Sequence, residues 1–238
     1  MTADKNLKNI ESEFIGECKK LGLLPTDEEL EKYRIFFEAV TDANKRFNLT
    51  AILDAREFYI KHFLDSLIPQ SEMAREASAL DLGCGAGFPS VPLKIARSDL
   101  KITALDATEK KIEFVKDAAK RLGFENFFTI CGRAEEKAAE LREAFDCVLS
   151  RAVAPLPVLL ELALPHVKVG GAFFAYKSNQ SELPLCQNAL SELGAKHKKT
   201  VNTVLPDGSA RSVLIFEKTA KTPQKYPRTF AKIKKNPL

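Results

Sequence analysis

Three of the chain's eleven glycines fall within five residues, in the segment 81–87 with the sequence DLGCGAG. The segment follows a short apolar stretch typical of a buried strand and precedes a predicted helix. Glycines at such a junction let the backbone turn tightly and let a ligand approach it closely. Asp106 ends the next predicted strand, where a carboxylate can accept hydrogen bonds from ribose hydroxyls. We therefore predict that Gly83, Gly85, Gly87 and Asp106 bind a cofactor that contains a nucleoside.

The spacing of these glycines discriminates between nucleoside cofactors. The spacing is GxGxG, whereas dinucleotide-binding loops have the third glycine one residue later and place a pyrophosphate at the helix N-terminus. S-adenosyl-L-methionine contains ribose and adenine but no phosphate, so it fits this loop better than NAD or FAD. A nicotinamide-dependent oxidoreductase and a purely structural glycine turn are the alternatives at this point.

Three basic residues, Arg133, Arg151 and Lys177, follow three different predicted strands. The carboxyl ends of parallel strands share one edge of a sheet, so we expect these side chains near the glycine loop. An arginine or lysine can donate to acceptor atoms of a base or hold a phosphate group. They are therefore candidate catalytic residues that position a substrate. The alternative is structural ion pairing with a carboxylate such as Asp65 or Glu135.

The elements that must position these residues follow an alternating order. From about residue 78 to 217, strands alternate with helices, which predicts an α/β protein with a doubly wound, mostly parallel sheet. One of these helices is expected from Glu135 to Arg142. The last two strands, near 198–205 and 211–217, flank a turn, so we expect a hairpin and one antiparallel strand.

The beginning of the chain has a different pattern. Apolar residues recur there at helical spacing, and Thr26 with Glu29 has the form of a capping box. We therefore expect a helical N-terminal extension at 1–69, a cofactor-binding domain at 70–218 and a basic tail at 219–238.

The tail is part of an uneven charge distribution. Residues 196–238 contain eleven lysines or arginines and two acids, a net charge of +9, although the whole chain carries only +4. Such a segment suits a polyanionic partner such as RNA. The alternative is a solvated tail that only keeps the protein in solution.

Other function classes are disfavoured by composition. No stretch has the ~20 apolar residues that span a bilayer, and the N-terminus lacks the basic and apolar pattern of a secretory signal, so we expect a cytoplasmic protein. Five cysteines without a CxxC pair predict reduced, buried thiols. With only three histidines and no metal-binding spacing, we expect no metal site. We also expect a monomer.

Several further segments carry a resemblance to a known family. They occur in a characteristic order around the glycine loop and are NLTAI at 48–52, HFLDSL at 62–67, FPSVPLKI at 88–95, RAEE at 133–136 and SRAVA at 150–154. Over about residues 30 to 180, this set closely resembles the bacterial RsmG (GidB) family of 16S rRNA guanine-N7 methyltransferases.

The resemblance implies a class I, Rossmann-like methyltransferase fold with a helical N-terminal extension. It implies S-adenosyl-L-methionine as cofactor and 16S rRNA or the small ribosomal subunit as partner. By the family pattern, the cofactor site would be lined by Gly83, Phe88, Ala134, Glu135 and Arg151. The chain has Cys84 and Ser90 where the family often has another small residue, so neither difference affects the site strongly.

Guanine N7 has an in-plane lone pair and no proton, so we expect no general base. Two alternatives share the cofactor features and differ in partner or activity. They are a small-molecule methyltransferase and a non-enzymatic RNA-binding protein on a Rossmann-like fold.

Overall fold

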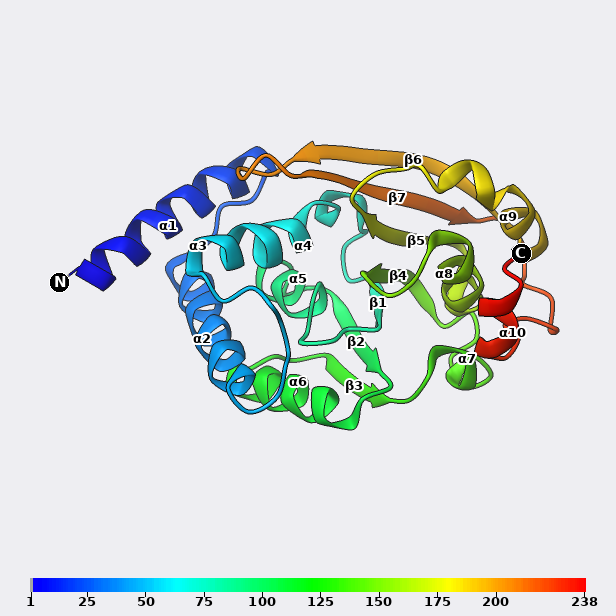
Figure 1. Ribbon diagram of the computed structural model, residues 1–238, viewed down its shortest axis with the longest axis horizontal. Helices are drawn as coiled ribbons and strands as arrows, with labels where there is room; N and C mark the ends of the chain where they lie inside the picture. The colour runs from blue at the N-terminus through cyan, green and yellow to red at the C-terminus, as the bar shows by residue number, and fades with distance from the viewer. Residues whose placement is uncertain (1) are drawn as a thin grey trace.

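The computed structural model describes residues 2–238, with side chains from Asn6 onward. A single sheet with the strand order β3-β2-β1-β4-β5-β7-β6 forms the centre of the described chain (Figure 1). Its strands are β1 Ser78–Leu82, β2 Lys101–Asp106, β3 Phe127–Cys131, β4 Phe145–Arg151, β5 Val167–Lys177, β6 Ala195–Val204 and β7 Ala210–Lys218.

The pairing of the strands confirms the predicted doubly wound sheet. All pairs from β3 to β5 are parallel, and β7 runs antiparallel to both of its neighbours, β5 and β6. The two last strands form the expected hairpin. The carboxyl ends of β1, β2, β3 and β4 therefore meet at one edge of the sheet, and this is the edge at which ligands bind in such folds.

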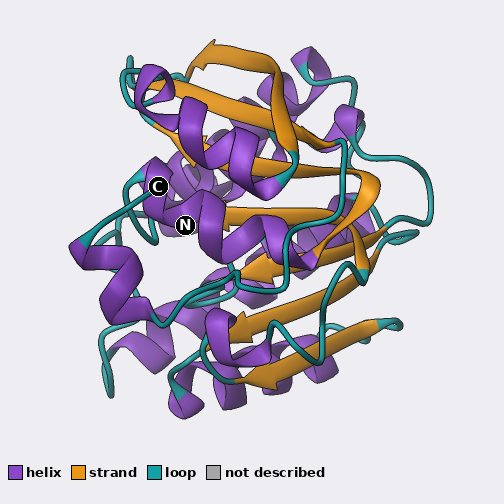
Figure 2. Cartoon of the chain, turned by 90° about the vertical axis from the view of Figure 1, so that its right-hand side faces the viewer, coloured by secondary structure: helices purple, strands orange, loops and turns teal. Residues whose placement is uncertain are grey.

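Helices cover both faces of the sheet (Figure 2). Successive strand residues point to opposite faces, so Ala79 packs into one core and Leu80 into the other. The first core includes residues of α1 Thr2–Lys20, α2 Asp27–Asn44, α5 Ser90–Ala96 and α6 Glu109–Arg121. The second includes residues of α7 Ala134–Lys137, α8 Leu156–Ala163, α9 Gln187–Leu193 and α10 Phe230–Lys235.

The N-terminal helices pack against the same face of the sheet as α5 and α6. The predicted capping box is confirmed, because Thr26 accepts from the Glu29 backbone and the Glu29 side chain accepts from the Thr26 backbone. The helical segment that follows Asp54 is continuous but not uniform. It consists of α3 Ala55–Phe58, a π-helix at Tyr59–Leu64 and α4 Asp65–Leu67.

Two expectations were wrong in detail. The helix expected to reach Arg142 ends at Lys137, and Arg142 instead donates to backbone carbonyls of residues 222, 223 and 226 in the C-terminal segment. Four of the cysteines are buried as expected, but Cys131 is exposed. Cys131 ends β3, and this strand has a neighbour on only one side, so its end is open to solvent.

In the described residues, no helix is both long and apolar enough to cross a membrane. Across the same part of the chain, no group of three or more histidine, cysteine, aspartate or glutamate side chains has an arrangement that could hold a metal ion.

Candidate active site

The glycine loop between β1 and α5 is shaped by backbone conformations that favour glycine. Gly83, Gly85 and Gly87 have φ values of 77°, 57° and 94°. The backbone N–H groups of Gly83 and Cys84 donate to the carbonyl oxygen of Leu105 at 2.8 and 3.0 Å, which attaches the loop to β2. The loop is therefore bonded to the sheet edge at the end of β2.

A side chain at these glycines would meet different surroundings. A Cβ atom on Gly83 would lie 2.5 Å from the Val153 side chain, and one on Gly87 would lie 2.8 Å from Val91. A Cβ atom on Gly85 would have no heavy atom within 4 Å. Gly83 and Gly87 thus allow close packing, whereas Gly85 keeps a space open.

Asp106 lies at the end of β2, as predicted, with its carboxylate against the glycine loop. One oxygen accepts from the backbone N–H of Gly85 at 3.0 Å, and the other accepts from Thr108 at 2.8 Å. A carboxylate has about four lone-pair directions, so both oxygens can still accept a hydroxyl. These contacts hold the group in place for a ribose.

Asp81, the acid at the start of the loop, is fully buried. Its carboxylate accepts from the backbone N–H of Ser90 at 3.0 Å at the beginning of α5. Burial raises the pKa of Asp81 to about 6, although the hydrogen bonds from Ser90 act in the opposite direction. Asp81 therefore connects β1 to α5 beneath the loop and does not line the cleft described next.

A cleft of about 430 Å³ opens above the loop, within the size range of small-molecule sites. Of the predicted site residues, it is lined by Gly83, Gly85, Phe88, Asp106, Arg133, Ala134, Glu135 and Arg151. Gly87 faces the core side of the loop, next to Val91 and Phe36, and Lys177 lines a second cavity, so neither lines this cleft. Lys111 and mostly small or apolar residues, among them Ala107 and Leu162, complete its walls. A carboxylate, an open glycine backbone and apolar walls suit a nucleoside without phosphate.

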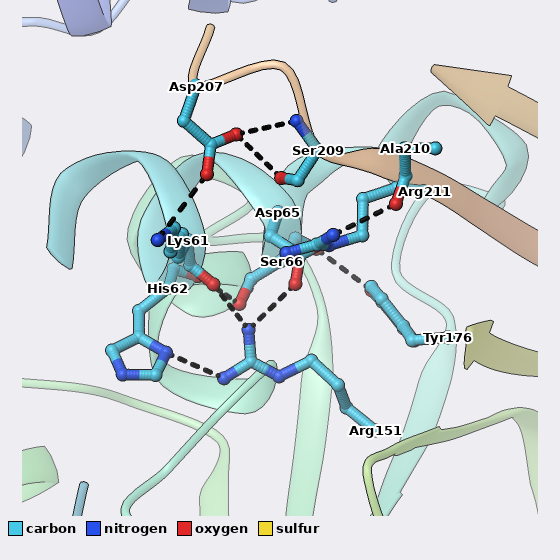
Figure 3. A network of polar contacts seen from close by, with 10 residues as sticks. All are labelled: Lys61, His62, Asp65, Ser66, Arg151, Tyr176, Asp207, Ser209, Ala210 and Arg211. Carbon is cyan, nitrogen blue, oxygen red and sulfur yellow. Dashed lines mark hydrogen bonds and ion pairs between the residues drawn. The ribbon is translucent and has the colours of Figure 1, made fainter. Parts of the chain in front are cut away.

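Arg151, at the end of β4, is held by a network of polar contacts (Figure 3). Its guanidinium donates to the carboxylate of Asp65 at 3.1 Å, to the carbonyl of Lys61 at 3.1 Å and to Nδ1 of His62 at 3.1 Å. Asp65 also forms an ion pair with Arg211 of β7 at 3.2 Å. Burial raises the pKa of Asp65, and the two arginines counteract that shift.

His62 takes a defined protonation state from this network. A guanidinium can only donate, so Nδ1 of His62 is the acceptor and Nε2 carries the proton. Nε2 then donates to Oγ of Thr50 at 2.7 Å. Burial lowers the pKa of His62 to about 3, with the charge of Arg151 adding to the effect. His62 is therefore a neutral orienting group at neutral pH.

Phe88 belongs both to the core and to the cleft. Only 6% of it is exposed, and its ring stacks on His62 with centroids 4.4 Å apart and an interplanar angle of 13°. The Arg151 guanidinium lies 5.1 Å from the same ring. Phe88 thus contributes to the position of Arg151 and also lines the cleft.

A second cavity of about 460 Å³ lies on the other side of Arg151. It is lined by Lys177 and Tyr176 of β5, by Arg211 of β7 and by His62 and Asp65. Lys177 donates to the carbonyl of Ala154 at 2.8 Å and pairs with Glu182 at 3.0 Å. Arg151 and Ala152 line both cavities, so the two meet there.

Some contacts in the site had no counterpart among the sequence predictions. Arg211 and Thr50 hold the Arg151 network, and Phe230 lines the cleft next to Arg133. Thr50 lies in one of the segments that carried the family resemblance, which was a usable signal. Arg211 begins a segment that was predicted only as a strand, and Phe230 lies in a segment that was interpreted by its charge alone.

Comparison with known sequences identifies relatives along almost the whole chain. The family described as "GidB: rRNA small subunit methyltransferase G" matches residues 29–210. Ribosomal RNA small subunit methyltransferase G of Leuconostoc citreum (strain KM20) is 41% identical over 233 residues, which cover 94% of this chain and 98% of that protein. The protein of the same description from Lachnoclostridium phytofermentans is 42% identical and covers 95% of this chain and 97% of its own length.

Comparison with solved structures concerns the fold. A precorrin-6y C5,15-methyltransferase from Geobacter metallireducens has a TM-score of 0.50 at 15% identity and covers 66% of this chain and 88% of its own. The structure of M. jannaschii TYW2 in complex with AdoMet has a TM-score of 0.52 at 14% identity, with coverages of 65% and 76%. The fold of the described chain is thus similar to that of class I, Rossmann-like methyltransferases.

Proposed function

Because this chain belongs to the family of ribosomal RNA small subunit methyltransferase G, we propose that it transfers a methyl group from S-adenosyl-L-methionine to N7 of a guanosine in 16S rRNA. The family membership confirms the resemblance inferred from the sequence motifs. It also favours rRNA over the small-molecule, non-enzymatic and nicotinamide-dependent alternatives. Such a substrate would be met in the cytoplasm, as free 16S rRNA or as a small ribosomal subunit.

The observation that carries this proposal is the pair of cavities that meet at Arg151. The first has the glycine loop and Asp106 and fits a phosphate-free nucleoside. The second has cationic side chains and fits an electron-rich base with its phosphate backbone. When bound, S-adenosyl-L-methionine would supply an electrophilic methyl group. The residues Gly83, Gly85, Asp106, Ala134 and Glu135 would hold it.

The side chains of the second cavity suit a reaction without proton removal. Both nitrogens of His62 have partners, Asp65 is paired with two arginines, and the Tyr176 hydroxyl donates to the carbonyl of Ser66 at 2.8 Å. Among the described residues that line this cavity, no free base is left. N7 of guanine carries no proton, so positioning and exclusion of water are sufficient.

Arg151 is the residue best placed to orient the base. Its guanidinium is held by Asp65 between the two cavities. There it can donate to guanine O6 and leave N7 free. Arg133, just after β3, and Lys177, the last residue of β5, would contact the RNA around the target nucleotide. In this proposal, the helical extension 1–69 holds Arg151 through His62, the domain 70–218 holds the cofactor, and the segment 219–238 faces the RNA.

The cofactor part of the proposal is tested with Asp106→Ala. The wild-type protein should bind S-adenosylhomocysteine in calorimetry and should not bind NAD. The variant should bind about 10- to 100-fold more weakly, because it loses hydrogen bonds to a charged acceptor. Asp117→Ala, an exposed aspartate of α6, is the matched control. Equal affinity of Asp106→Ala and wild type would disprove the role of Asp106.

The substrate part is tested with small subunits from cells that lack the enzyme. Labelled methyl groups should enter 16S rRNA, and mapping should find them on N7 of one guanosine. Methylation at an exocyclic amine or at a ring carbon would contradict the proposed chemistry.

A further inference from the structure

The C-terminal segment contributes a side chain to the cofactor cleft. Phe230, the first residue of α10, lines the cleft together with Gly132, Arg133 and Ala134, which follow β3. Its ring is half-buried, and the Arg133 guanidinium lies 5.9 Å from the ring centroid. In Figure 1, α10 lies beside α7 and α8, on the face of the sheet opposite α5 and α6.

A buried ion pair fixes the segment just before Phe230. Glu161 of α8 has no exposed surface, although α8 is otherwise built from apolar residues and one proline. The Arg228 side chain donates to its carboxylate at 2.8 and 2.6 Å, and the Arg228 backbone N–H donates at 2.8 Å. Removing one partner of such a pair leaves a buried charge without compensation. The segment is therefore an integral part of the fold.

Further contacts hold the segment on both sides of that pair. Arg142 donates to the carbonyls of Thr222, Pro223 and Tyr226 at 2.5, 3.0 and 3.0 Å. After Phe230, the side chain of Ile233 is completely buried in the core that includes α8 and α9. Phe230 is thus held at the cleft from both directions in the sequence.

The position of Phe230 indicates which part of a ligand it would contact. Asp106 ends β2, and Ala107 and Ala134 follow β2 and β3, so the side of the cleft next to the predicted ribose position has small apolar walls. Phe230 and Leu162 extend this apolar surface. The other aromatic residue of the cleft, Phe88, is stacked on His62 and lies next to Arg151. An apolar surface with an aromatic ring fits a purine base.

We propose that Phe230 forms the aromatic wall against the adenine base of the cofactor, so that the C-terminal segment is part of the cofactor site. This inference rests on the proposed function, because it assumes an adenosyl cofactor in the cleft. It assigns to the segment a second role besides its charge. Arg228 and Glu161 act as positioning residues, since they seat Phe230 and do not line the cleft.

The test is the affinity of Phe230→Ala for S-adenosylhomocysteine and for adenosine alone, measured by calorimetry. Loss of an aromatic contact to a base should weaken both affinities by about 5- to 100-fold. Phe230→Tyr keeps the ring and should retain the wild-type affinity. Phe128→Ala is the matched control, because Phe128 is a phenylalanine of β3 that is 57% exposed and does not line the cleft.

Each outcome decides between the inference and its premise. If the wild-type protein binds both ligands and Phe230→Ala binds them equally well, the role of Phe230 is wrong and the proposed function stands. If the wild-type protein binds neither ligand, the proposed function itself fails. Should Phe230→Ala be unfolded by circular dichroism, Phe230→Leu keeps apolar bulk without a ring. A wild-type affinity of Phe230→Leu would then overturn the inference, and a weakened one would support it.

Discussion

The two sides of the candidate active site are built from different parts of the chain. The side formed by the ends of β1 and β2 consists of backbone, with three glycines at positive φ and a single carboxylate that binds backbone N–H groups. The side around Arg151 consists of charged and polar side chains from the N-terminal helices, β4 and β7. The first side depends on the absence of side chains, and the second depends on the balance of buried charges.

This difference determines how each side can fail. On the side formed by the ends of β1 and β2 (the glycine side), a substitution adds atoms or strains the backbone, and the damage remains local. On the side around Arg151 (the arginine side), a substitution removes a counter-charge and leaves the oppositely charged partners buried without compensation. We therefore expect large effects on stability from the charged side and graded effects from the glycine side.

The largest effect is expected for Asp65→Ala. Asp65 is 5% exposed and pairs with both Arg151 and Arg211. Removing it should lower the free energy of unfolding by about 3–5 kcal/mol, which urea denaturation measures. Asp42→Ala is the control, because the pair of Asp42 with Lys45 lies on the surface and should contribute less than about 1 kcal/mol. Similar losses in both variants would contradict the assigned importance of the network.

Folded Asp65→Ala protein should also separate the two sides by function. Methyl transfer should fall strongly because Arg151 loses its fixed position, whereas the affinity for S-adenosylhomocysteine should change little. A parallel loss of cofactor affinity would mean that the two sides are not independent.

The next largest effect is expected for Gly87→Ala. Its φ of 94° disfavours a side chain, and the added Cβ would lie 2.8 Å from Val91 and 3.3 Å from Phe36. We expect a loss of about 2–4 kcal/mol in unfolding free energy, from the strained backbone and the tight contact. Gly85→Ala, with open space around it, should lose only about 1 kcal/mol. Equal losses would show that the surroundings of the loop do not matter.

The same contrast explains what could be predicted from sequence. The glycine loop, Asp106, the capping box at Thr26 and the hairpin are local patterns, in which neighbours along the chain determine the structure. The parallel sheet follows from the alternation of such elements. For this reason the sequence predicts the fold and the position of Gly83, Gly85 and Asp106 at the cleft, whereas Gly87 packs toward Val91 and does not line it.

The partners of Arg151 are not a local pattern. Asp65 lies 86 residues before Arg151 in the chain, and Arg211 reaches the same carboxylate only through β7. Phe230 lies in a basic segment in which no periodicity marks it, and the ion pair of Arg228 with Glu161 brings it to the cleft. The sequence allowed an ion pair between Arg151 and Asp65 as an alternative. That Arg211 pairs with the same Asp65 carboxylate follows only from the folded arrangement of α4, β4 and β7.

A smaller effect, visible only in acid, is expected for His62. Its pKa is lowered to about 3 in the folded protein, below the ordinary value of 6.5, chiefly by burial. The neutral form is therefore favoured by folding, so its contribution to stability is complete above pH 6.5 and is lost as the pH falls toward 3. At pH 5, protonation of His62 in the unfolded chain should by itself reduce stability by about 2 kcal/mol relative to neutral pH. His166, whose pKa burial lowers to about 4, adds a loss of its own in the same pH range.

His62→Gln isolates this contribution. The variant keeps hydrogen-bonding groups but cannot take up the proton, so its stability should fall less between pH 7 and pH 5 than that of the wild type. Denaturation curves at both pH values measure the difference. Equal losses of unfolding free energy in the two proteins would show that protonation of His62 does not contribute to the acid sensitivity of the fold.

The smallest effect is expected for the exposed lysines of α10. Lys232, Lys234 and Lys235 of α10 are exposed, and none of them pairs with an acid in the part of the chain with described side chains. For RNA binding, the logarithm of the association constant falls linearly with the logarithm of the salt concentration. Replacing all three lysines by alanine should make this slope shallower by about 2–3, because each phosphate contact contributes about 0.7–0.9 to it. The affinity for S-adenosylhomocysteine should not change, since these side chains do not line the cleft.

The control must remove the same charge from another place. Lys8, Lys19 and Lys20 are exposed lysines of α1, which lies at the opposite end of the molecule from α10 (Figure 1). Their replacement by alanine should leave the salt dependence almost unchanged, because contact with a phosphate is local and net charge is not. If both triple variants shift the slope equally, net charge alone attracts the RNA. If only the α10 variant does so, the lysines of α10 contact RNA phosphates directly. The C-terminal segment would then bind RNA through these lysines and the cofactor through Phe230.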